Sequence, residues 1–100
     1  YAVSGHPLGP FRKYENNPIL CGTGDVSGTG HHCLTESPDG TERFIVYHRH
    51  AAPGRIHPRQ MAIDRIRFLS RPDGPDRLQV LGPTTTPQPL PSGVISARRP

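Results

Sequence analysis

Short stretches in the middle of the chain place apolar side chains at strand spacing and are separated by turn sequences. In Ser37-Pro38-Asp39-Gly40, proline presets φ and glycine supplies the left-handed residue of a tight turn, and residues 71–74 repeat this turn chemistry. Successive antiparallel strands joined by tight turns form a meander. The sequence therefore predicts an all-β fold, with an antiparallel four-stranded meander over residues 31–36, 41–50, 59–69 and 78–81.

The second of these predicted strands, residues 41–50, is apolar on both faces until its end. Because side chains alternate along a strand, Phe44 and Val46 point to one face, and Ile45 and Tyr47 to the other. We therefore expect this strand to be covered on both faces. The chain on either side of the meander is rich in glycine and proline, and from Gly82 onward it predicts an extended tail or connector.

Composition limits how much core the chain can bury. Of 100 residues, 32% are hydrophobic, and 13 Pro with 11 Gly leave little apolar surface to offset the chain entropy lost on folding. The chain also begins on Tyr1 rather than on methionine, inside what resembles a strand end. We expect it to be a piece of a longer protein; the alternative is a small, partly disordered basic protein.

Charge and cysteine content argue against several classes of partner. The net charge of +4 comes from 12 Lys+Arg and 8 Asp+Glu, but the arginines are scattered and form no basic stripe of the kind that binds nucleic acid. No apolar run is long enough to cross a bilayer, so we expect neither nucleic acid nor membrane as a partner. Cys21 and Cys33 form no CxxC motif, and whether they pair stays open. Localisation and oligomeric state are not indicated.

Strand register predicts a cluster of basic side chains at one end of the sheet. If Glu36 pairs with Arg43 across the first turn, His31 falls opposite His48, and pairing of the third strand then adds the start of that strand to the same end. The side chains expected at this rim are His31, His48, Arg49, His50 and Arg59, beside the glycines of residues 28–30. The cluster fits a transition-metal site, a solvated rim without function, or a pocket for a polar substrate or an anion.

Several short motifs follow one another along the chain: Pro7-Leu8-Gly9-Pro10-Phe11, Glu15-Asn16-Asn17-Pro18-Ile19-Leu20, Gly28-Thr29-Gly30-His31-His32, Pro38-Asp39-Gly40, Ile45-Val46-Tyr47-His48-Arg49, then Arg59 and Ile63-Asp64-Arg65-Ile66 with Phe68. In order and spacing they resemble the last part of family 43 glycoside hydrolases. That resemblance implies a five-bladed β-propeller of four-stranded antiparallel blades. Residues 1–26 would be the end of the preceding blade with its connector, 27–82 the final blade, and 83–100 the proline-rich tail or connector.

The resemblance also implies an activity. Family members hydrolyse O-glycosyl bonds of arabinose- and xylose-containing plant polysaccharides or oligosaccharides with inversion, as α-L-arabinofuranosidases, β-xylosidases or arabinanases. Inversion needs a carboxylic acid on one side of the bond and a carboxylate that activates water on the other. In the family these carboxylates come from earlier blades, so this piece alone is expected to be inactive. The alternatives are a non-catalytic carbohydrate-binding or scaffold propeller and an independent basic binding protein.

Two residues of this chain match site positions of the family. His31 matches a histidine near the propeller axis that is associated with a calcium ion and its waters beneath the substrate pocket; the alternative is a hydrogen-bonded histidine that fills the channel. Arg59 matches an arginine that reaches the active-site carboxylates, and the alternative is an ion pair at the rim. None of the chain's own carboxylates is expected to be catalytic. Asp64, the one on a strand among apolar neighbours, is expected to pair in the surroundings of Arg65 or Arg67.

Overall fold

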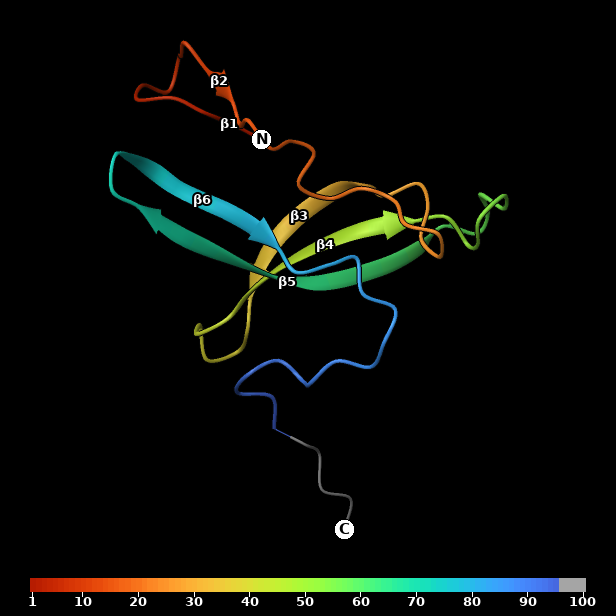
Figure 1. Cartoon of the computed structure of the whole chain (residues 1–100). Helices are drawn as coiled ribbons and strands as arrows, with labels where there is room; N and C mark the ends of the chain where they lie inside the picture. Colours follow the sequence, from red (N-terminus) through yellow and green to blue (C-terminus); the bar gives the residue numbers. More distant parts are fainter. Residues whose placement is uncertain (96–100) are drawn as a thin grey trace.

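The computed structural model describes residues 1–95, which form two antiparallel β-sheets and no helix (Figure 1). The small sheet is a hairpin of β1 (Ala2–Val3) and β2 (Arg12–Lys13). The large sheet has the spatial order β3-β4-β5-β6. Its strands are β3 (Gly30–Glu36), β4 (Arg43–Arg49), β5 (Gln60–Arg71) and β6 (Gly74–Val80). The predicted all-β fold with a four-stranded meander is confirmed.

The register between β3 and β4 is as predicted near the turn and differs at the far end. Glu36 pairs with Arg43, and the same register continues to the pairing of Cys33 with Val46. A bulge then places Gly30, and not His31, opposite His48. The predicted pairing of His31 with His48 was wrong by one position, because a bulge sets two residues of one strand against one of its partner.

The register between β4 and β5 agrees with the prediction over its whole length. It runs from Arg43 opposite Ile66 to Arg49 opposite Gln60, the register that places Arg59 at the same end of the sheet as His50. The last strand is longer than expected and begins at Gly74 instead of Leu78. The tight turn before it brings Gly74 directly opposite Arg71, so pairing starts immediately.

The core is small and centred on β4. Ile45, Tyr47 and Ile66 form a buried cluster on one face, and apolar side chains of the N-terminal connector, β5 and β6 pack against it. Burying one such side chain stabilises the fold by about 1.5–3 kcal/mol. On the other face Phe44 is also buried, with the Arg65 guanidinium 5.1 Å from its ring centroid. The expectation that this strand is covered on both faces is confirmed.

The N-terminal hairpin is attached to β5 and β6. Its Tyr1 and Tyr14 rings stack with centroids 4.7 Å apart, and the Leu78 backbone N–H donates a hydrogen bond of 3.1 Å to the Tyr1 hydroxyl. Arg71 and Glu15 form an ion pair of 2.8 Å. These contacts hold the hairpin and its connector against one side of the large sheet.

The proline-rich segment after β6 forms neither helix nor strand up to residue 95 (Figure 1). Residues 96–100 of the predicted tail lie outside the described residues. Throughout the described chain there is no helix long and apolar enough to cross a membrane.

Candidate functional site

The rim is the end of the large sheet where β3 begins, β4 ends and β5 begins. His31 lies in the bulge of β3 with φ of +50°, and within residues 1–95 it is the one non-glycine residue with positive φ. A bulge re-aims side chains, and a left-handed conformation at a non-glycine residue is uncommon, though histidine adopts it more readily than most. The His31 ring is exposed, and its centroid lies 6.3 Å from that of the half-buried His48 at an interplanar angle of 21°.

The glycine-rich loop runs directly against two of the rim histidines. Gly28 has φ of +66°, and a Cβ at this position would overlap the imidazole of His50. Two residues later, Gly30 lies under the His48 ring. A Cβ at Gly30 would be 3.7 Å from the nearest ring atoms of His48. The backbone N–H of His50 also donates a 2.8 Å hydrogen bond to the carbonyl of Ser27. Glycine is therefore required at residue 28 both for conformation and for space.

Two buried polar atoms at this rim lack hydrogen-bond partners within the described chain, His48 Nδ1 and Ser27 Oγ. Leaving a buried polar group unpaired costs about 1–3 kcal/mol, and most folds avoid it. Within residues 1–95 these are the two buried side-chain polar atoms whose hydrogen-bonding capacity the fold does not use. That property is typical of a site that meets solvent or a ligand.

The structure places Arg59 at the rim but gives its side chain no partner among residues 1–95. It is exposed and directly precedes Gln60, the first residue of β5, which pairs with the last residue of β4. The neighbouring Arg49 has its Nε 3.5 Å from the carbonyl of His50. The ion pair at the rim that sequence left open for Arg59 is therefore not formed within the described chain.

The carboxylates with hydrogen-bonded or ion-paired side chains lie away from the rim. Glu36 and Glu42 pair with arginines near the β3–β4 turn, and Asp39 is hydrogen-bonded within that turn. Glu15 is held by Arg71. These side chains are thus engaged in contacts within the fold, and that no carboxylate of this chain is catalytic stays a prediction.

Asp64 differs from what the sequence predicted. It is buried, and it accepts hydrogen bonds from the Tyr47 hydroxyl at 2.5 Å and from the backbone N–H and hydroxyl of Thr84 at 3.3 and 2.5 Å. The predicted partners in the surroundings of Arg65 or Arg67 were wrong, because alternate residues of a strand point to opposite faces. Burial, and then the bond to Asp64, raise the pKa of the Tyr47 hydroxyl.

A hollow of ≈ 700 Å³ lies between the N-terminal hairpin and the rim end of the sheet. It is lined by the hairpin and its connector, by residues of the glycine loop, and by His32 and Ile45. Sequence reasoning did not single out this hollow or His32. The reason is that its two walls come from segments joined only by an irregular connector, whose path the sequence does not define.

The histidines at the rim do not form a metal centre with other side chains. Among the residues that the structure describes, no group of three or more His, Cys, Asp or Glu side chains is placed to hold a metal ion. Calcium prefers oxygen ligands, so His31 fits at most one contact to such an ion and the chain alone does not build the site. Cys21 and Cys33 are both exposed free thiols and are not bonded to each other.

Comparison with known proteins shows what the chain resembles. The model of the family "Glycosyl hydrolases family 43" matches residues 1–74. A crystal structure of a thermostable family-43 glycoside hydrolase is 48% identical over 91% of this chain, with a TM-score of 0.77. An endo-1,4-beta-xylanase from Bacteroides thetaiotaomicron is 31% identical over 82% of the chain, with a TM-score of 0.70.

This chain spans 28% of the first of those structures and 27% of the second. No curated protein matches it. The family model covers most of the chain, and strands β3, β4 and β5, their register and the glycine loop before His31 lie within the matched residues. The chain belongs to glycosyl hydrolase family 43.

Proposed function

We propose that this chain is part of a glycosidase that hydrolyses O-glycosyl bonds in arabinose- or xylose-containing plant polysaccharides or oligosaccharides, with inversion. The observation that carries the proposal is the 48% identity, over 91% of the chain, to a family-43 glycoside hydrolase. The similarity to a protein described as an endo-1,4-beta-xylanase favours a xylose-containing substrate within that class. The partner is accordingly a carbohydrate.

Within that enzyme we assign residues 27–82 to the final blade of a five-bladed propeller and residues 1–26 to the end of the preceding blade with its connector. Apolar side chains left exposed on both faces of the sheet support this assignment. Met61 is 82% and Ile63 47% exposed on one face, and Leu34 is 51% exposed on the other. Large apolar side chains on both faces of a sheet are expected where further sheets pack against it.

The chemistry is divided between this chain and the rest of the enzyme. An inverting mechanism needs two opposed carboxyl groups, and the hydrogen-bonded carboxylates of this chain are held within its own fold. We therefore place the acid and base outside this chain and assign it one wall of the substrate pocket. His31 presents an exposed imidazole there, and Arg59 presents a guanidinium that would hold a neighbouring carboxylate ionised and lower its pKa.

We also propose that the full-length enzyme binds a calcium ion at the propeller axis. His31 would supply one imidazole contact to this ion, and water would supply the others. We derive no catalytic step from it. Treatment of the full-length enzyme with a chelator is expected to lower activity, and added calcium to restore it. Equal rates with and without the chelator would remove calcium from the role of His31.

Hydrolysis of aryl glycosides by the full-length protein tests the proposal directly. We expect release of the aryl group from an α-L-arabinofuranoside or a β-xyloside, and proton NMR of the first-formed sugar should show the inverted anomer. The 100-residue chain alone should be inactive. Sugar binding without turnover would instead identify a non-catalytic carbohydrate-binding or scaffold propeller, and a retained anomer would contradict the inverting mechanism.

A further inference from the structure

The segment after β6 lies against the sheet although it forms no strand. Its first contact continues the β5–β6 pairing, because the Leu81 backbone N–H donates a 2.9 Å hydrogen bond to the carbonyl of Arg65. Its second contact is the pair of hydrogen bonds from Thr84 to the buried carboxylate of Asp64. Gly82 permits this approach, since a Cβ at that position would overlap the Asp64 carboxylate.

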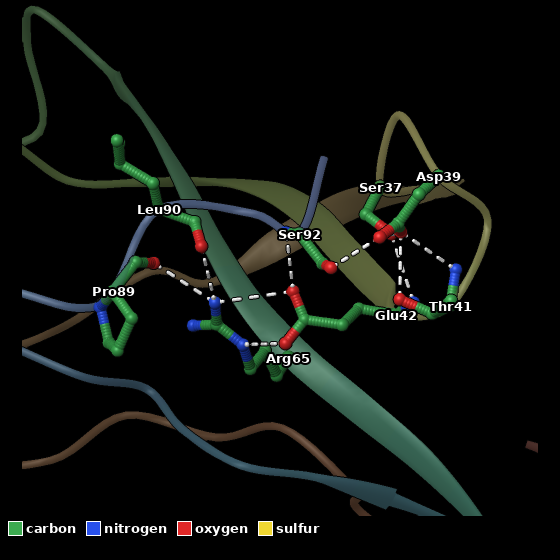
Figure 2. A network of polar contacts seen from close by, with 8 residues as sticks. All are labelled: Ser37, Asp39, Thr41, Glu42, Arg65, Pro89, Leu90 and Ser92. Carbon is green, nitrogen blue, oxygen red and sulfur yellow. Dashed lines mark hydrogen bonds and ion pairs between the residues drawn. The ribbon is translucent and has the colours of Figure 1, made fainter. Parts of the chain in front are cut away.

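Farther along, the same segment meets an ion pair that links β5 to the β3–β4 turn, residues 37–42 (Figure 2). Arg65 and Glu42 approach to 2.9 Å, and both are partly buried. Arg65 also donates to the carbonyl of Pro89 at 2.9 Å, while Glu42 accepts a 2.9 Å hydrogen bond from the Ser92 backbone N–H. The two charged groups thus bond each other and the backbone of the segment.

The turn itself forms the last part of this network. Asp39 accepts hydrogen bonds from the hydroxyls of Ser37 at 2.8 Å and Thr41 at 2.7 Å, and from the hydroxyl of Ser92 (Figure 2). Gly93 follows with φ of +84°, and a Cβ there would lie 2.9 Å from the backbone nitrogen of Asp39. The segment and the turn are therefore in close contact, with a glycine at the point of closest approach.

We propose that residues 81–93 are an intramolecular clasp, which fixes the β3–β4 turn to β5 and connects the end of β6 to that turn, two parts of the sheet that do not pair with each other directly. The strand order places β6 at one edge and β3 at the other. A segment that leaves β6 and ends on the β3–β4 turn spans the sheet between these edges. Charge-assisted hydrogen bonds, which are stronger than neutral ones, hold its end. The match to the family model ends at residue 74, before the clasp begins.

Amide hydrogen exchange in the full-length protein tests the clasp without reference to activity. In the wild type we expect the Ser92 and Thr84 amides to be protected, as amides of a strand are and those of a loose linker are not. Glu42→Ala removes the acceptor of the Ser92 amide and the partner of Arg65. It should speed exchange at Ser92 by at least about tenfold, because hydrogen bonds to charged groups are among the stronger ones.

Two further variants keep the test decisive. Arg67→Ala is the matched control, because Arg67 lies on the same strand as Arg65 but, among residues 1–95, its side chain bonds only Gln79 of β6. Exchange at Ser92 should not change. If Glu42→Ala does not fold, Ser92→Ala, which removes only the hydroxyl bond to Asp39, should still speed exchange of the segment. The clasp would be overturned if the wild-type segment exchanged as fast as an unstructured peptide. It would also be overturned if neither Glu42→Ala nor Ser92→Ala changed exchange of the segment.

Discussion

The two ends of the β3–β4 hairpin differ in whether their polar side chains are hydrogen-bonded within the fold. At the turn end, Glu42 pairs with Arg65, and both Glu42 and Asp39 accept hydrogen bonds from Ser92 of the clasp. At the rim, the His48 Nδ1 and Ser27 Oγ atoms have no partner in residues 1–95, and the exposed His31 adopts a left-handed conformation. Both ends restrict the chain, but the polar side chains of the turn end bond one another, whereas two buried polar atoms of the rim remain unpaired within residues 1–95.

We interpret this difference as one between a structural region, the turn end, and the proposed functional region, the rim. A saturated polar network rigidifies a fold and is lost mainly as stability when one member is removed. Local strain and unsatisfied polar atoms cluster where a protein meets its ligand. Substitutions at the turn end and in the clasp should therefore change stability, and substitutions at the rim should change activity.

The largest effect on stability is expected at Asp64, which holds the clasp to the centre of the sheet. Asp64→Ala leaves the buried Tyr47 hydroxyl unpaired and frees Thr84, and we expect the free energy of unfolding to fall by about 2–3 kcal/mol. Chemical denaturation of the full-length protein measures this. Glu15→Ala, which removes an exposed ion pair, is the control. Equal stability of the two variants would refute the assignment of a stabilising role to the clasp.

At the rim, His31→Ala is expected to lower kcat/KM by about 10- to 100-fold, the range seen when a group that supports an active site is removed. The melting temperature should fall by only a few degrees, because the side chain is exposed and alanine in the left-handed conformation costs about 1 kcal/mol. His6→Ala, a change in the N-terminal hairpin far from the rim in sequence, serves as the control. Loss of stability in parallel with activity would make His31 a structural residue.

A smaller effect is expected from Arg59. If its guanidinium lies beside a catalytic carboxylate, Arg59→Ala should raise the pKa of that carboxylate, since an opposite charge favours the ionised form. The acidic limb of the pH–rate profile would then move to higher pH, and kcat/KM would fall by up to about tenfold at neutral pH. Arg55→Ala, in the loop before Arg59, should leave the profile in place. An unmoved acidic limb in Arg59→Ala would exclude this role.

The smallest effect is expected from acid on the clasp. The hydrogen bond to Arg65 and then the Ser92 N–H lower the pKa of Glu42, and the Ser92 and Thr41 hydroxyls lower that of Asp39. Groups whose pKa falls on folding contribute fully above their ordinary values of 4.5 and 3.8, and that contribution is lost as pH falls through the lowered values. Protection of the Ser92 amide should therefore decrease in acid before that of Leu81. Equal loss at both amides would contradict this.

Much of the sheet could be predicted from its local sequence. The two Pro-Asp-Gly turns and the alternation around Ile45 define the strands, and Glu36 opposite Arg43 defines the register near the turn. The bulge at His31 could not be predicted, because the adjacent glycines indicate only that the loop is permissive. That the rim histidines come together follows from register alone.

The clasp could not be predicted from the sequence for a different reason. Its bonds join Asp39, Glu42 and Asp64 to residues 20 to 53 positions later in the chain. A proline-rich segment has the same composition whether it is a loose linker or packs against a sheet. The partner of Asp64 could not be predicted either, since Thr84 lies in that segment.

The most direct test of the account compares kcat/KM of His31→Ala with that of Glu42→Ala, both in the full-length enzyme and both corrected for the fraction folded. We expect Glu42→Ala to retain nearly wild-type kcat/KM and His31→Ala to fall about 10- to 100-fold below it. Equal values for the two variants, or a larger loss in Glu42→Ala, would contradict the assignment of function to the rim and of structure to the clasp.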